Sequence, residues 1–435
     1  TTASNNTAVG STALLANTTG ASNVAVGASA LTSNTTATGN NAIGLSALGS
    51  NTTGASNNAM GQQALLNNTT GTNNTAIGHV ALGDNTTASN NTAVGYLALN
   101  ANTTGELNTA IGVQSLDANT TGSSNTALGI DSLGGNTTGG SNVAVGRGAL
   151  YSNTTASNNV AVGLNALVTN TTGTRNVAVG ALALDANTTA SNNNAFGYSA
   201  LGANTTGAGN QAFGDSALAA NTTAAKNVCV GHNSLAALTT ADNNTAIGDN
   251  AMAVNTTGAN NVAVGALALD ANTTASNNTA IGFKSLTANV TGTYNTAVGF
   301  NAGAATTANY NTAIGYLALQ DATAGANTAV GGEAAKDITT GHSNVAMGTS
   351  AGFAITTGLY NVSIGHTSGG ATTGQGNVAI GYYGGSSMTT GSQNVVIGRQ
   401  SQLSTGSGNN QIVMGYLVSG SGDNNFTFGN QSTDS

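Results

Sequence analysis

Asn6-Thr7-Ala8-Val9-Gly10 decides the fold, because this five-residue pattern returns along the whole chain. The next copies are Asn23-Val24-Ala25-Val26-Gly27 and Asn40-Asn41-Ala42-Ile43-Gly44. Counting the closing glycine from Gly10 to Gly429 gives 26 copies. They are 17 residues apart as far as Gly299, and 14, 16 or 17 residues apart afterwards. A fixed short period is typical of a repeat array, in which each unit packs against its neighbours.

The composition indicates an ordered chain rather than a disordered one. Of 435 residues, 62 are Gly, none is Pro and only 5% are charged, while 39% are hydrophobic. Disordered chains usually combine high net charge with few β-branched residues, whereas here Val, Ile and Leu recur at fixed places. The absence of Pro fits a backbone whose N–H groups are used in β-ladders.

Charge and hydropathy exclude two classes of partner. The net charge is −8 and no basic patch exists, which argues against nucleic-acid binding through phosphate contacts. No apolar run approaches the roughly 18 residues of a membrane span, so we expect no membrane insertion. The chain starts at Thr1-Thr2, at the repeat position of Thr18-Thr19, so we expect a piece or processed product of a longer protein.

One repeat, residues 6–22, contains too few residues to fold alone. Ala8 and Val9 lie in a strand-like segment that ends at Gly10, and residues 12–15 form a second strand-like segment. Residues 16–22 are turn-forming Asn, Thr, Gly and Ser. The period predicts an all-β fold, a parallel β-solenoid of 26 coils of about 17 residues, with each coil pairing with the next.

Successive side chains of a strand point to opposite faces, so the repeat positions can be assigned to faces. The Ala8 and Ala13 positions are small in nearly every coil, and the position that follows each of them is large and apolar. Their first members are Val9, Val26 and Ile43, and Leu14, Leu31 and Leu48. We expect the alanines inside a thin coil and both large positions outside, buried against other chains in a homotrimer that could also extend end to end. The alternative is a wider monomeric solenoid with Val9 and Leu14 inside.

Asparagine precedes the strand in every coil until Gln411. Stacked amide side chains can hydrogen-bond to one another along parallel stacks. The sequence therefore predicts an asparagine ladder, whose first members are Asn6, Asn23, Asn40 and Asn57.

The repeated Asn-x-Ala-Val/Ile-Gly-x-x-Ala-Leu unit resembles the head repeats of YadA-like trimeric autotransporter adhesins. It resembles more closely the longer-period repeats of phage tail-fibre shafts. The resemblance covers essentially the whole chain and implies a trimeric, left-handed β-roll on the surface of a cell or virion. Residues 411–430 look like the segment that precedes a self-cleaving intramolecular chaperone domain in phage fibres. The adhesin repeat lacks the loop that contains Asn17-Thr18-Thr19-Gly20, so its cross-section need not apply here.

The Asn-Thr-Thr loop recurs through the first part of the chain and reads as an N-x-Thr glycosylation sequon. A column of glycans would begin at Asn17, Asn34, Asn51 and Asn68. The competing interpretation is a turn whose Asn and Thr side chains bond their own backbone. Ice binding by a threonine ladder is disfavoured, because these threonines are adjacent and lie in a loop.

Sequence changes divide the chain into three regions. Residues 1–294 form the regular shaft with Asn-Thr-Thr loops, and residues 295–409 replace the repeated Leu by Gly or Ala and are rich in Tyr. Residues 410–435 form terminal coils and a cap or junction. A recognition surface for a cell-surface glycan would comprise Tyr316, Tyr360, Tyr382, Tyr383 and Tyr416. The alternative is that tyrosines cover the gaps left by the lost leucines.

No constellation of catalytic or metal-ligating residues accompanies the repeats. His79, His232 and His366 share one repeat position and lie many coils apart, and no CxxC pair or phosphate loop occurs. Cys229 replaces the repeat Ala and is expected to be a small buried residue. We therefore expect no enzyme, cofactor or metal site. The predicted function is a rigid fibre shaft, extracellular or on a virion, that supports attachment; the alternative is a cell-surface filament protein that binds glycans along its flank.

Overall fold

A computed structural model describes residues 3–370 and 373–430, so the expectation that rests on Thr1-Thr2 lies outside the described residues. Within the described residues the protein is all-β, with 26 parallel strands that form a β-solenoid and no helix. The chain divides into two compact units, residues 1–223 and 224–435. The predicted fold class is confirmed in each unit.

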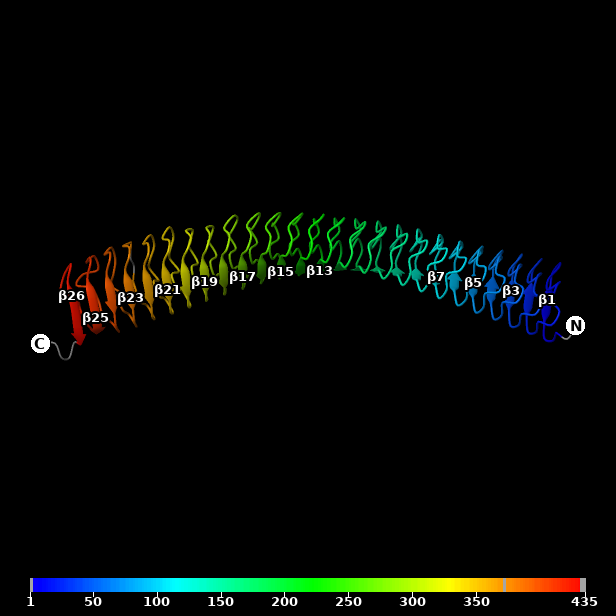
Figure 1. Ribbon diagram of the computed structural model, residues 1–435, viewed down its shortest axis with the longest axis horizontal. Helices are drawn as coiled ribbons and strands as arrows, with labels where there is room; N and C mark the ends of the chain where they lie inside the picture. The colour runs from blue at the N-terminus through cyan, green and yellow to red at the C-terminus, as the bar shows by residue number, and fades with distance from the viewer. Residues whose placement is uncertain (1–2, 371–372, 431–435) are drawn as a thin grey trace. The chain divides into compact units, whose positions relative to one another are not determined.

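Each coil contributes one short strand, and within each unit successive strands lie side by side (Figure 1). The strands of the first unit are β1 (Thr7–Val9), β2 (Val24–Val26), β3 (Asn41–Ile43), β4 (Asn58–Met60), β5 (Thr75–Ile77), β6 (Thr92–Val94), β7 (Thr109–Ile111), β8 (Thr126–Leu128), β9 (Val143–Val145), β10 (Val160–Val162), β11 (Val177–Val179), β12 (Asn194–Phe196) and β13 (Gln211–Phe213). Those of the second unit are β14 (Val228–Val230), β15 (Thr245–Ile247), β16 (Val262–Val264), β17 (Thr279–Ile281), β18 (Thr296–Val298), β19 (Thr312–Ile314), β20 (Thr328–Val330), β21 (Val345–Met347), β22 (Val362–Ile364), β23 (Val378–Ile380), β24 (Val395–Ile397), β25 (Ile412–Tyr416) and β26 (Phe426–Asn430).

The register between strands follows the repeat. In β2 and β3, Val24 pairs with Asn41 and Ala25 with Ala42, one repeat apart. The central residue, usually Ala, points into the coil in nearly every strand: Ala25 and Ala42 are fully buried. The flanking residues point outward, which is the alternation that a half-buried strand requires.

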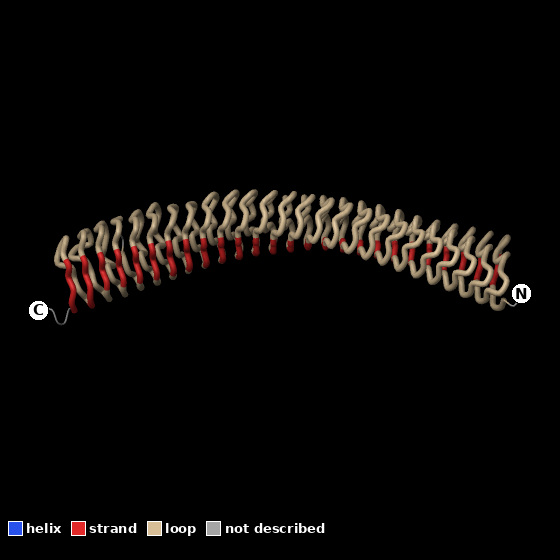
Figure 2. Tube along the Cα trace, in the orientation of Figure 1, coloured by secondary structure: helices blue, strands red, loops and turns tan. Residues whose placement is uncertain are grey.

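The second segment of the repeat is not a strand, so the prediction of two strands per coil was wrong. It forms consecutive tight turns, shown as loop in Figure 2. In the third coil Ser46 and Leu48 have φ of 56° and 52°, in the left-handed region. The Ala47 N–H donates to the Gly44 carbonyl at 3.3 Å, which closes one of these turns. Left-handed φ breaks the two-residue side-chain alternation that the prediction assumed.

The turns place the repeated Leu inside the coil rather than outside it. Leu31 and Leu48 are fully buried, and their neighbours Ala30 and Ala47 are buried as well. A Cβ built at Gly385, which holds the Leu position, would lie 3.2 Å from the Ala379 Cβ of the strand. The core therefore consists of strand alanines packed against turn leucines, and the prediction that the Leu14 position is an outer surface is corrected.

Two asparagine columns link neighbouring coils. In the column that begins at Asn6, the Oδ1 of Asn23 accepts the backbone N–H of Asn40 at 2.9 Å. The Asn40 Nδ2 donates to the Gly54 carbonyl at 2.9 Å. The predicted ladder thus exists, but its main bonds join side chain to backbone. The amide-to-amide ladder lies in the Asn-Thr-Thr loop, where the Asn68 Nδ2 donates to the Asn51 Oδ1 at 2.9 Å.

The glycine that ends each strand sits at a corner where neighbouring coils approach closely. Gly112 has φ of 140°, and a Cβ added there would lie 2.4 Å from the Gly129 carbonyl oxygen. Only glycine fits both the backbone conformation and this contact.

Two coils in residues 295–409 lose the core Leu and regain its volume from another position, whereas Leu319 keeps the buried Leu of the regular coil. Gly352 and Gly385 hold the Leu position with φ of 57° and 63°. A Cβ on Gly352 would lie 2.9 Å from the Ile355 Cδ1, and one on Gly385 would lie 2.6 Å from the Met388 Cε. Ile355 and Met388 replace the loop Asn and are buried. Side chains from inside the coil therefore fill these gaps, and the interpretation that tyrosines cover them is wrong at both positions.

This exchange predicts a compensating pair of substitutions. Gly352→Leu alone overpacks the coil, and we expect it to destabilise the fold by about 1–3 kcal/mol. Adding Ile355→Asn restores the Leu and Asn of the regular coil and should recover most of that loss. A double-mutant cycle on the unfolding free energies measures the coupling. If the two substitutions change the unfolding free energy additively, the idea that Ile355 fills the space of the missing Leu is contradicted.

The last coils are built differently from the regular coils. β25 and β26 each have five residues and pair at five positions. Their core contains larger side chains, among them Val396, Leu403, Val413 and Val418, which cluster with Ala379 and Met388. A thicker apolar core replaces the alanine–leucine packing of the regular coils.

Candidate functional site

The outward side chains of the strands form the strand face, which consists of the first and third residue of each strand. In the third position the side chains are all apolar, and many are exposed: Ile43 by 40%, Met60 by 45% and Leu128 by 44%. Phe196 and Phe213 stack with ring centroids 4.8 Å apart. Thirteen coils about 4.8 Å apart make this stripe about 60 Å long in each unit, and such a stripe exceeds what soluble monomers usually expose.

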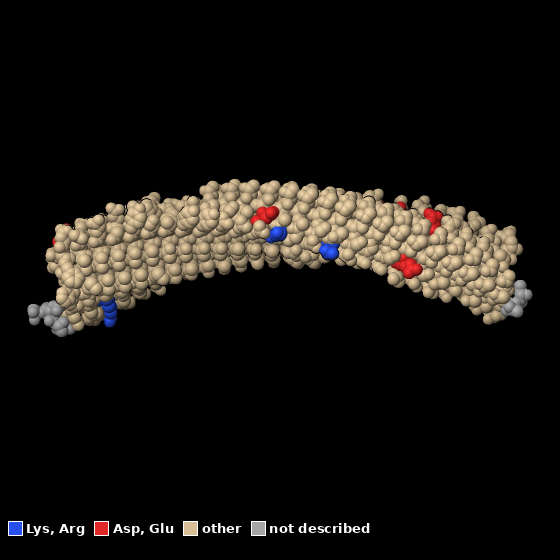
Figure 3. Space-filling view, in the orientation of Figure 1, with Lys and Arg blue, Asp and Glu red and all other residues tan. Residues whose placement is uncertain are grey.

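Charged residues are absent from the strand face between β1 and β26. Its first-position residues are Thr, Val, Asn, Gln, Ile or Phe, and its third-position residues are Val, Ile, Leu, Met or Phe. The few charges of the chain lie elsewhere on the coil and are scattered, as the view in Figure 3 shows. The outward placement predicted for Val9, Val26 and Ile43 agrees with this face.

The sequon asparagines lie inside the coil. Asn34, Asn51 and Asn68 are fully buried. The Asn34 Nδ2, the atom that a glycan would modify, donates to the Asn17 Oδ1 at 2.9 Å and to the Ala37 carbonyl at 3.2 Å. Asn17, in the first coil, is half-buried and its Nδ2 donates to the Gly20 carbonyl. Glycans on these nitrogens are incompatible with the fold, and the turn interpretation is the one that the geometry supports.

Three of the five tyrosines singled out from the sequence come together in the second unit. His366 stacks on Tyr382 at 5.3 Å, and the Arg399 guanidinium lies 5.6 Å from the ring centroids of both Tyr382 and Tyr416. Tyr383 meets Tyr382 edge-on at 4.6 Å. Sequence reasoning missed His366 and Arg399 as members, although they share the repeat position just after the corner glycine with Tyr382 and Tyr416.

The other two tyrosines lie apart from this cluster. Tyr316 stacks on Phe300 at 5.6 Å, and Tyr360 meets His342 edge-on at 5.3 Å. Phe300 thus covers one ring face of Tyr316, and both tyrosines are more than half exposed. These contacts show that both tyrosines help to hold neighbouring coils together, and they do not bring the two rings into one recognition surface.

Titratable groups do not assemble into a reactive centre among the described residues. No three of the His, Cys, Asp and Glu side chains there are placed to hold a metal ion. The His232 Nδ1 lies 3.1 Å from the Asp249 Oδ1, with both side chains more than half exposed. Cys229 is buried, as predicted, and burial raises the pKa of its thiol. Burial also raises the pKa of Asp117, with a smaller contribution from the Asp131 carboxylate.

Comparison with known proteins assigns no family. A scan against protein-family models finds no match, and a search of curated proteins finds no match either. The part of the chain that the structure describes contains no helix with the length and hydropathy of a membrane span.

Proposed function

We propose that this protein is the shaft of a surface-exposed fibre, resembling a phage tail fibre or an adhesin, and that it serves as a rigid spacer for attachment. The observation that carries the proposal is the uncharged strand face with its exposed apolar side chains. Association of three copies through this face removes the apolar stripe from water. Every added coil lengthens the shaft by about 4.8 Å without changing that interface.

The hydrogen bonds between neighbouring coils support a mechanical role. Within each unit, side-chain and backbone hydrogen bonds connect neighbouring coils at the strand and at the Asn6 column, and in the regular coils also at the Asn17 column and the loop threonines. The Thr52 hydroxyl, for example, donates to the Thr69 carbonyl at 3.0 Å. The first and third residues of the strands carry no charged, His or Cys side chain among the described coils, so the chemistry of the strand face suits assembly rather than turnover.

The oligomeric mass tests the proposal. A trimer has three times the 41.8 kDa chain mass, about 125 kDa, and light scattering at micromolar concentration should report it. Ile77→Glu with Ile111→Glu places two carboxylates on the strand face, and we expect the mass to fall to that of one chain because buried unpaired charges are costly.

The matched control is Thr87→Glu with Thr121→Glu, which adds the same charges at exposed loop positions with the same spacing. This variant should remain trimeric. A single-chain mass for the unmodified protein would overturn assembly through the strand face, and a trimeric Ile77→Glu, Ile111→Glu variant would place the interface elsewhere.

A further inference from the structure

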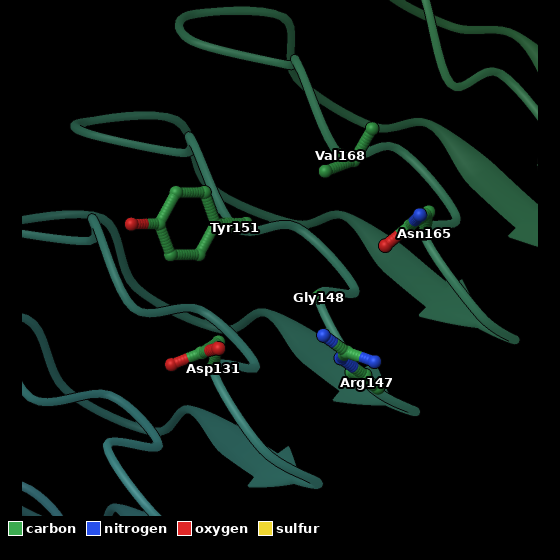
Figure 4. Close-up of a pocket in the computed structure, with 6 residues that line it drawn as sticks. All are labelled: Asp131, Arg147, Gly148, Tyr151, Asn165 and Val168. Carbon is green, nitrogen blue, oxygen red and sulfur yellow. The ribbon is translucent and has the colours of Figure 1, made fainter.

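The turn side of the first unit contains a hollow that interrupts the repeat. It has a volume of about 200 Å³ and is lined by Asp131, Arg147, Gly148, Tyr151, Asn165 and Val168 (Figure 4). Asp131, Gly148 and Asn165 occupy the same position in three successive coils, two residues after the corner glycine. Gly148 lacks the side chain that its two neighbours have, so this Gly148 hollow opens between them.

The lining combines an aromatic ring with hydrogen-bonding groups of both kinds. The Asp131 carboxylate accepts hydrogen bonds, the Arg147 guanidinium donates them, and the Asn165 amide does both. Arg147 forms no ion pair with another residue of the described chain, and the six lining residues include one cation, Arg147, and one carboxylate, Asp131. A lining with balanced charge favours a neutral ligand with many hydroxyl groups over an anion or a cation.

Tyr151 differs from the stacked tyrosines of the second unit. Its Cδ2 and Cε2 lie against Gly134 of the preceding coil, at 3.2 and 3.1 Å from a Cβ built there. Within residues 3–370 and 373–430 no other ring stacks on it, and its side chain is 48% exposed. Tyr151 thus offers the hollow an apolar ring surface that no other aromatic ring covers.

We propose that the Gly148 hollow binds one neutral pyranose unit of a glycan. Its volume is below the roughly 300 Å³ at which pockets for drug-sized ligands begin, so a single sugar ring is the appropriate size. The ring of Tyr151 contacts the C–H face of the sugar, while Asp131, Arg147 and Asn165 bond its hydroxyl groups. The proposal is independent of assembly through the strand face, because the hollow is built by the turns after the corner glycine.

Saturation-transfer NMR with D-glucose, D-galactose, N-acetyl-D-glucosamine and L-rhamnose, each used alone as the probe, tests this site. At least one sugar should bind with a dissociation constant on the order of 1 mM, as befits a small open site. Gly148→Asn should weaken that binding at least tenfold, because it fills the hollow. Asn is compatible with the φ of 65° at Gly148, and Asn165 adopts the same conformation at 54° one coil later. A Cβ at Gly148 would lie 2.5 Å from the Asn165 Oδ1, so the variant also pushes that amide out of its place in the lining.

Tyr151→Ala should weaken binding to a similar extent, and it keeps the test decisive if the Gly148 variant folds poorly. The control is Tyr198→Ala, which removes another exposed tyrosine of the same unit that does not line the hollow. Binding in this control should be unchanged. If none of the four sugars binds, or if binding survives both Gly148→Asn and Tyr151→Ala, the proposal is overturned.

Discussion

Gly331→Ala is expected to destabilise the second unit by at least about 3 kcal/mol. Gly331 is a corner glycine with φ of 135°, and a Cβ there would lie 2.6 Å from both the carbonyl carbon and the carbonyl oxygen of Gly348. Those atoms belong to the backbone of the next coil, which is fixed by its own ladder bonds, including the Gly348 N–H to the Val330 carbonyl at 2.8 Å. The strain therefore cannot be relieved by moving one side chain.

The adjacent residue provides the control. A Cβ on Gly332 would meet no atom within 4 Å, so Gly332→Ala should change stability by less than about 0.5 kcal/mol. Because repeat arrays can unfold locally, amide hydrogen exchange in peptides that cover β20 and β21 is the appropriate measurement, together with the denaturation midpoint. Equal hydrogen-exchange protection in the two variants would show that a Cβ at the corner position does not strain the backbone.

The sequence predicted the features that depend on period alone. The 17-residue spacing of the corner glycines determines coil number, parallel pairing and register, because every coil must place the same residue over the same neighbour. The small Ala of each strand likewise predicted a thin interior, and Ala25 and Ala42 are buried there.

The sequence did not reveal that the second segment of the repeat forms turns with Leu inside, because the two-residue alternation of a strand does not hold in turns. Leu48 follows Ala47 directly, and both point inward since Leu48 has a left-handed φ of 52°. Nothing in a Ser-Ala-Leu segment marks that conformation. The same ambiguity hid the amide ladder in the loop, where the sequon pattern suggested exposure for Asn68 although the residue is buried.

Of the two candidate sites in the turns, one could be predicted from the sequence and the other could not. Spacing alone could have shown that His366, Tyr382, Arg399 and Tyr416 occupy one repeat position, so the row was accessible from the sequence. The Gly148 hollow depends on the missing side chain at Gly148, between Asp131 and Asn165, and on the packing of the Tyr151 ring toward the preceding coil. Those features are three-dimensional, and the outward turn position of Gly148 had to be known first.

Asn68→Asp tests the loop ladder, and we expect it to cost at least about 3 kcal/mol at neutral pH. The Asn68 Nδ2 donates to the Asn51 Oδ1 at 2.9 Å and to the Gly71 carbonyl at 3.0 Å, and its Oδ1 accepts from the Asn85 Nδ2 at 2.8 Å. A carboxylate keeps the acceptor but turns both donor contacts into oxygen–oxygen repulsions. It also buries a charge at a position with no exposed surface.

The pH dependence of this variant distinguishes charge from shape. Burial and the two facing oxygens favour the protonated acid, so the pKa of the introduced carboxyl group in the folded state should lie above its unfolded value of about 4. The folded state then binds the proton more tightly, and the stability lost in Asn68→Asp should be partly regained as the pH falls toward about 4. Urea denaturation of the variant and the unmodified protein from about pH 4 to about pH 8 measures the difference.

Asn68→Leu is the control for the loss of the amide without added charge. Leu238 already holds this column position in the second unit and is fully buried, so the coil accepts a leucine there. We expect Asn68→Leu to cost about 1–3 kcal/mol, because the Asn85 Nδ2 and the Asn51 Oδ1 each lose a partner, and this cost should not vary with pH. If Asn68→Asp is as stable as Asn68→Leu at about pH 8, the position tolerates a charge. The buried amide ladder could not then be what joins the coils at the Asn-Thr-Thr loop.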